Sequence, residues 1–177
     1  MLQKHTKYKI SMQRISCHVL LLIASVLSFT VAIAQTPPNF DLIKLEHSAD
    51  YKPASPFALQ TANYLLSTPL KVDNPDRIKS LQFIYKWMTG TPDYSFRLDE
   101  AANTIFKGNN ELMGIYMASM VKYSLENKAE AKDPKAVKLN SLLGTIAYCE
   151  KKENNVKPSK SLKKLLEARD KGELDKL

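Results

Sequence analysis

The feature that most constrains this chain is a helix-start signal that occurs three times, a polar residue followed by proline and then by apolar residues at helical spacing. Ser55-Pro56, Asn74-Pro75 and Asp133-Pro134 each have this form. Proline is favoured at the first helical position because the N–H that it lacks would have no partner there. Since apolar residues recur three or four positions apart after each signal, the pattern predicts helices. No run of the sequence alternates as a long strand would.

Six helices are expected in all. The first three run from Ser55 to just before Pro69, from Pro75 to Gly90, and over about 98–107. The next three run over about 110–126, from Pro134 onward, and from a cap at Ser159 to Gly172. The sequence therefore predicts an all-α fold, a single bundle or array of about five to six helices. We interpret Gly90, Gly108 and Gly172 as helix terminators, because glycine readily adopts the positive φ found at helix C-termini.

The segment 110–126 is expected to be the central helix. Apolar side chains cover most of its circumference, which is typical of a helix surrounded by others. We expect five of them to be mostly buried: Leu112, Ile115, Tyr116, Met117 and Met120. Gly114 and Ala118 lie four residues apart on one face, where another helix can approach closely.

The beginning of the chain has the three parts of a secretory signal peptide. Four basic residues and no acidic one precede an apolar run over 19–34, which ends in Ala32-Ile33-Ala34. A basic region, an apolar region and a small-x-small site are the marks of a cleaved leader. Residues 1–34 are thus expected to be removed between Ala34 and Gln35, and the protein to be exported to the periplasm or the extracellular space. An uncleaved membrane anchor is the alternative, and translation from Met1 or Met12 is left open.

Residues 35–54 are interpreted as a linker, because Pro37, Pro38 and Pro53 restrict them, although their apolar residues could pin the segment to the domain. Residues 55–177 are expected to form a single helical domain.

The charge balance argues against a nucleic-acid partner. The chain has 26 basic and 18 acidic residues, a net charge of +8, and removing the four leader cations leaves 22 against 18, or +4. Nucleic-acid binders show a concentrated basic stripe, whereas here the surplus of positive charge is mild and lies toward the end of the chain.

In the last helix, Leu162, Leu165 and Leu166 line one face and are expected to dock on the domain. The lysines on the other face would permit a weak contact with an anionic membrane surface.

Catalytic and metal-binding patterns are lacking. After cleavage one cysteine, Cys149, and one histidine, His47, remain. A zinc site needs several such ligands at fixed spacing, and no glycine-rich phosphate loop is present. We therefore expect no catalytic residues, no metal and no cofactor, and a packing role for Cys149.

An aromatic group surrounds the turn Thr89–Asp93. The single tryptophan, Trp87, lies off the core stripe set by Ile84 and Met88. Exposed aromatic residues dominate binding hot spots, so Trp87, Tyr94 and Tyr85 are predicted to form an exposed interaction patch. The alternative is that Trp87 packs under the following loop.

Two stretches, Phe83–Phe96 and Leu112–Ala118, resemble an uncharacterised family of small exported helical proteins from Gram-negative bacteria. The resemblance implies an exported helical domain and brings no known activity.

The function suggested by these features is that of an exported, non-enzymatic interaction protein of the periplasm or cell surface with an unknown protein partner. A binder of a small hydrophobic or carbohydrate ligand is the alternative. A hydrolase without a recognisable motif comes third.

Overall fold

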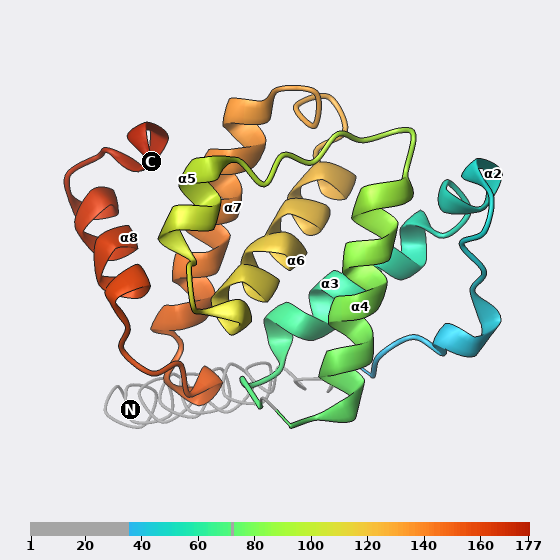
Figure 1. The fold of residues 1–177 in the computed structure, drawn as a ribbon, viewed down its shortest axis with the longest axis horizontal. Helices are drawn as coiled ribbons and strands as arrows, with labels where there is room; N and C mark the ends of the chain where they lie inside the picture. Colours follow the sequence, from blue (N-terminus) through green and yellow to red (C-terminus); the bar gives the residue numbers. More distant parts are fainter. Residues whose placement is uncertain (1–35, 72) are drawn as a thin grey trace, which may run out of the picture. The chain divides into compact units, whose positions relative to one another are not determined.

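A computed structural model describes residues 36–177 except Val72 (Figure 1), and these residues belong to one compact unit, Ala34–Leu177. The predicted signal peptide and its cleavage site lie outside the described residues. Seven α-helices are found in the described part of the chain: α2 (Ser48–Tyr51), α3 (Ser55–Ser67), α4 (Pro75–Gly90), α5 (Glu100–Ile105), α6 (Asn110–Glu126), α7 (Pro134–Glu150) and α8 (Lys160–Asp170). Three single 3-10 turns accompany them: η1 (Phe40–Leu42), η2 (Lys152–Asn154) and η3 (Leu174–Lys176). The all-α prediction is confirmed, and the six expected helices correspond to α3–α8.

The helix starts form as their sequences predict. The Asn74 side chain accepts hydrogen bonds from the N–H groups of Asp76 and Arg77, at 2.9 and 3.1 Å. Asp133 caps α7 through the N–H of Lys135, and Ser159 caps α8. These caps satisfy N–H groups that have no partner inside a helix. At the first signal the helix begins one position earlier, so that Ala54 occupies the cap and Ser55 is already helical.

Helix α6 is the central element, in contact with α3, α4 and α7. Leu112, Ile115, Tyr116 and Met120 are buried as predicted, while Met117 is half-buried at the surface. The close approach expected at Gly114 is made by α4. A Cβ atom added there would lie 2.6 Å from Leu81 Cδ2.

The segment before α3, interpreted as a linker, packs on the helical domain through its apolar residues. Leu45, Tyr51 and Ala54 are buried, and α2 contacts α4. The prolines stiffen the segment, but they do not prevent it from packing on the domain. Burial of its apolar side chains is favourable because it removes apolar surface from water.

One of the three predicted terminator glycines has another role. Gly108 and Gly172 have φ of +74° and +67°, as expected of helix terminators. Gly90 is the last residue of α4 and is not among the glycines with positive φ. A Cβ atom at Gly90 would lie 2.1 Å from the Cζ and Oη atoms of Tyr51. Gly90 is therefore needed for the close approach of the Tyr51 ring and not for its backbone freedom.

The end of α3 is stabilised by a buried arginine that the sequence analysis did not single out. Arg77 Nη1 donates hydrogen bonds to the main-chain oxygens of Leu65 and Thr68, both at 3.1 Å, and to Thr68 Oγ1 at 2.7 Å. A cation is favoured at this end of a helix because the unpaired carbonyl groups carry partial negative charge. Tyr148 Oη donates to the same Thr68 oxygen, which ties α7 to the cap.

Helix α8 docks through its leucines, as expected. Leu165 is buried and Leu162 and Leu166 are partly buried against the core, while the lysines at 160, 163 and 164 are exposed. A contact of α8 with an anionic surface would therefore be electrostatic, and it stays a prediction. The helices in the described residues are all too short or too polar to cross a bilayer.

Candidate functional site

The single tryptophan lies inside the molecule, and the prediction that it is exposed is wrong. Trp87 has no exposed surface, and its Nε1–H donates to the main-chain oxygen of Tyr51 at 3.1 Å. The rings of Tyr94 and Phe96 lie 5.8 and 5.9 Å from it, centre to centre. The face of α4 that carries Trp87 is thus covered by α2 on one side and by the segment after α4 on the other.

The segment 94–99 is extended, and its side chains alternate in direction. Tyr94, Phe96 and Leu98 are partly buried, whereas the residues between them, Ser95, Arg97 and Asp99, are exposed. Successive side chains of an extended chain point to opposite sides. Tyr94, Phe96 and Leu98 line one hollow together with α4, and Arg97 and Asp99 line another together with α7. Ser95 lines both.

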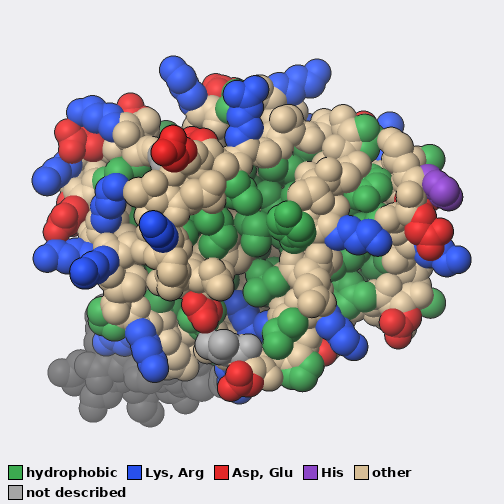
Figure 2. All heavy atoms as spheres, in the orientation of Figure 1, with side chains coloured by type: hydrophobic (Ala, Val, Ile, Leu, Met, Phe, Trp, Pro, Cys, Tyr) green, Lys and Arg blue, Asp and Glu red, His purple; other side chains and the backbone are tan. Residues whose placement is uncertain are grey.

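The first of these, which we call the aromatic hollow, has a volume of about 280 Å³ and lies between α4, the extended segment and α6. Its floor and walls come from nine residues, none of them charged: Tyr85, Met88, Thr89, Thr91, Tyr94, Ser95, Phe96, Leu98 and Met117. Apolar side chains gather on the face drawn in Figure 2, in the area between α4 and α5. Two members of the predicted patch, Tyr85 and Tyr94, thus line one hollow, while the third member, Trp87, is buried.

Tyr85 and Tyr94 contribute differently to the aromatic hollow. Tyr85 is 56% exposed and stands on the outer edge of α4. Tyr94 is held by its contact with Trp87, and burial, followed by the nearby charge of Asp93, raises its pKa. Like any tyrosine hydroxyl, that of Tyr94 carries its proton at neutral pH and can donate a hydrogen bond.

An unpaired hydroxyl group lies in the wall of the aromatic hollow. Thr91 is 8% exposed, and its Oγ1 atom has no hydrogen-bond partner among the described residues. Thr89, two residues earlier, instead donates to the main-chain oxygen of Tyr85 at 3.0 Å. Leaving a buried hydroxyl unpaired costs about 1–3 kcal/mol. The position of Thr91 Oγ1 is therefore unfavourable for folding and suits a group that a bound molecule pairs.

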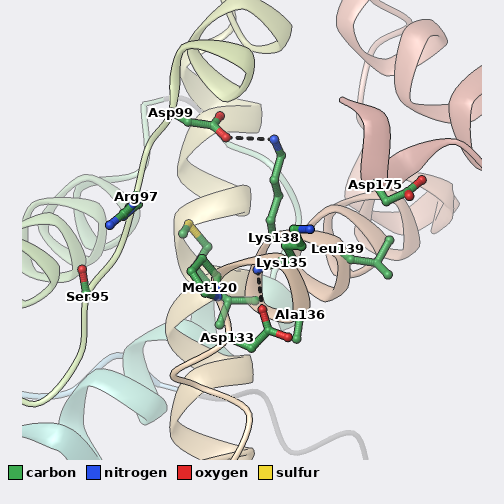
Figure 3. Close-up of a pocket in the computed structure, with 12 residues that line it drawn as sticks. Ser95, Arg97, Asp99, Met120, Asp133, Lys135, Ala136, Lys138, Leu139 and Asp175 are labelled. Carbon is green, nitrogen blue, oxygen red and sulfur yellow. Dashed lines mark hydrogen bonds and ion pairs between the residues drawn. The ribbon is translucent and has the colours of Figure 1, made fainter.

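The second hollow is larger, about 490 Å³, and two of its charged residues, Lys138 and Asp99, form an ion pair (Figure 3). Lys138 Nζ lies 2.8 Å from Asp99 Oδ2 and 2.8 Å from the main-chain oxygen of Leu177. Asp133 is engaged as the cap of α7, as the dashed line to Lys135 in Figure 3 shows. These contacts join α5, α7 and the end of the chain, so we assign this hollow a structural role.

Cys149 and His47, the one cysteine and the one histidine after the predicted cleavage site, lie in different elements. Cys149 is half-buried on α7, whereas His47 is exposed at the start of α2. Neither lines one of the two hollows. Within the described residues, no three His, Cys, Asp or Glu side chains lie together in a way that could hold a metal ion.

Cys149 is expected to be unreactive in the folded protein. Burial, followed by the charge of Glu150, raises its pKa from 9.0 to about 12. Because the thiolate is the reactive form, alkylation by iodoacetamide at pH 8 should be at least about a hundredfold slower in the native protein than in urea. The folded thiol also keeps its proton up to about pH 12, whereas the unfolded one loses it near pH 9, so folding stability should fall as the pH rises above 9. Equal alkylation rates in both states would contradict the packed position of Cys149.

Comparison with known protein families, with curated proteins and with solved structures gave no match. The resemblance of Phe83–Phe96 to a family of small exported helical proteins stays a prediction, and the function must be inferred from the hollows themselves.

Proposed function

We propose that this chain is an exported, non-enzymatic interaction protein and that the aromatic hollow is its recognition site. The observation that carries the proposal is the unpaired, buried hydroxyl of Thr91 in the wall of an uncharged hollow. The basic and apolar leader supports export.

The lining of the hollow favours binding over catalysis. Acid–base and nucleophilic chemistry depends on titratable groups with shifted pKa values. The lining contains no carboxylate, imidazole or thiol, and a tyrosine hydroxyl is neutral at pH 7. Neutral rings and hydroxyls recognise neutral groups, through burial of apolar area and through hydrogen bonds.

The partner that fits this lining is an uncharged segment of another protein. A volume of about 280 Å³ lies near the lower end of ligand pockets, which span about 300–1,000 Å³, and is enough for one or two side chains. Thr91 Oγ1 and the Tyr94 hydroxyl can pair with peptide groups beside such side chains. Tyr85 is exposed at the edge, where an aromatic residue can contribute strongly to an interface.

Photocrosslinking tests this proposal. A benzophenone amino acid placed at position 85 should capture one discrete partner protein in the envelope fraction of intact cells. The captured band should weaken at least fivefold when Thr91→Val or Tyr94→Ala is added. Placed at Phe57, which is exposed on α3, the same probe should not capture that partner. Equal capture from positions 85 and 57, or capture that both added substitutions leave unchanged, would overturn the proposal.

A carbohydrate ligand is the alternative, and the molecule contains its own reporter. Trp87 contacts Tyr94 and Phe96 from below, so a sugar bound on these rings should change the tryptophan fluorescence. Saturable changes with a neutral saccharide, abolished by Tyr85→Ala, would favour this alternative over a protein partner.

A further inference from the structure

A separate hollow of about 260 Å³ lies where the end of α3, the middle of α6 and the second half of α7 meet. It shares no lining residue with the aromatic hollow. Leu66 and Ala147 are apolar lining residues, Ser119 and Gly144 also line the hollow, and the charged groups are those of Lys122, Glu126 and Lys151.

A buried hydroxyl without a partner belongs to one of the residues that line this hollow. Ser119 is 4% exposed, and its Oγ atom forms no hydrogen bond with any described residue. The facing position on α7 is Gly144, where a Cβ atom would lie only 3.1 Å from Ser119 Oγ. Glycine at this position therefore keeps a methyl group from pressing on the hydroxyl.

Two buried hydroxyls on the neighbouring helix α7 show that packing inside the domain does not require a hydroxyl to be unpaired. Ser141 and Thr145 each donate to the main-chain oxygen four residues earlier, at 2.6 and 2.8 Å. Ser119 also lies within a helix, yet makes no such bond. The free energy cost of an unpaired hydroxyl suggests that Ser119 is kept for a ligand.

The charges at the hollow distinguish its two lysines. Lys122 Nζ is engaged by Asn63 Oδ1 at 2.8 Å and by Glu126 Oε1 at 2.6 Å. Lys151 is exposed and forms no ion pair within the described part of the chain. It is thus the cation available to an anionic group, and the chain from residue 122 onward carries a surplus of positive charge, with 14 basic and 9 acidic residues.

From these observations we infer that the hollow binds a small amphipathic carboxylate. Its apolar chain lies between Leu66 and Ala147, a hydroxyl or carbonyl group at its inner end pairs with Ser119 Oγ, and its carboxylate remains near the surface beside Lys151. The inference is independent of the function proposed for the aromatic hollow.

Binding of 6-hydroxyhexanoate, followed by amide shifts in ¹H–¹⁵N spectra of the complete mature chain, tests the inference. The compound has the carboxylate, the short apolar chain and the distal hydroxyl, and saturable shifts should centre on Ser119 and Gly144. Hexanoate lacks the distal hydroxyl and should bind about three- to tenfold more weakly, the value of one hydrogen bond. 1,6-Hexanediol lacks the carboxylate and should also bind more weakly.

Three variants and two controls complete the test. Ser119→Ala should weaken binding of 6-hydroxyhexanoate to the level of hexanoate, and should not lower the Tm of the free protein, because it removes an unpaired group. Gly144→Ala should abolish binding by placing a methyl group about 3.1 Å from Ser119 Oγ, where the ligand's inner group would have to lie. Lys151→Gln should weaken binding and reduce its salt dependence. The first control, Ser141→Ala, removes a paired buried hydroxyl, so it should lower the Tm and leave binding unchanged. The second control, Lys152→Gln, should also leave binding unchanged. Absence of saturable shifts at these residues, or equal affinities of the Ser119→Ala variant and the wild-type protein, would overturn the inference.

Discussion

Replacing Trp87 by alanine is expected to lower the free energy of unfolding by about 3–5 kcal/mol, the usual cost of deleting a large aromatic side chain from a core. The indole is completely buried, contacts the rings of Tyr94 and Phe96, and donates a hydrogen bond to Tyr51. The substitution removes the packing and leaves the Tyr51 oxygen without its donor. Urea denaturation followed by far-ultraviolet circular dichroism measures the change without relying on the tryptophan signal.

Trp87→Phe is the matched control. It keeps much of the ring contact and loses the indole N–H, so its cost should be clearly smaller than that of the alanine variant. The wild-type emission should be blue-shifted and poorly quenched by iodide. Red-shifted, strongly quenched emission together with a stability change below about 1 kcal/mol in Trp87→Ala would show that the ring is at the surface.

Gly90→Ala is the second substitution expected to have a large effect, and its sign is opposite to that predicted from helix propensity. In a helix, alanine is favoured over glycine by about 1 kcal/mol. Here the added Cβ would lie 2.1 Å from atoms of the Tyr51 ring, a distance that requires the ring or α2 to move. Overpacking of this kind costs about 1–3 kcal/mol. We expect a net loss of stability, measured as a lower midpoint of urea denaturation.

A double-mutant cycle isolates the cause. In a Tyr51→Ala background the obstructing ring is gone, so that Gly90→Ala should become neutral or stabilising. The Trp87 hydrogen bond is made to the main chain of residue 51 and can persist in this background. If Gly90→Ala costs the same in both backgrounds, the close approach of Tyr51 is not the reason for glycine at this position.

Half of the candidate site could be predicted from the sequence. The aromatic group around the end of α4 was identified, and Tyr85 and Tyr94 do line a common hollow. The exposure of Trp87 was predicted wrongly, because the pattern of α4 shows only which face meets α6 and not that α2 covers another. Thr91 and Ser119 had no signal in the sequence, since an unpaired hydroxyl is defined by the partners that it lacks.

The sequence by itself determined the features that depend on neighbouring residues. The caps at Asn74, Asp133 and Ser159 form because a side chain reaches N–H groups two or three residues ahead. The central place of α6 follows from apolar residues around most of its circumference.

Only the tertiary structure decided the features that depend on residues distant in the chain. Tyr51 and Trp87 are 36 residues apart and Arg77 lies 12 residues after Leu65, yet each pair is joined by a hydrogen bond. Ser119 on α6 packs closely against Gly144 on α7, where any side chain would press on its hydroxyl. Local periodicity determines which face of a helix is apolar, whereas the packing of the helices determines what covers that face and which polar atoms are left unpaired.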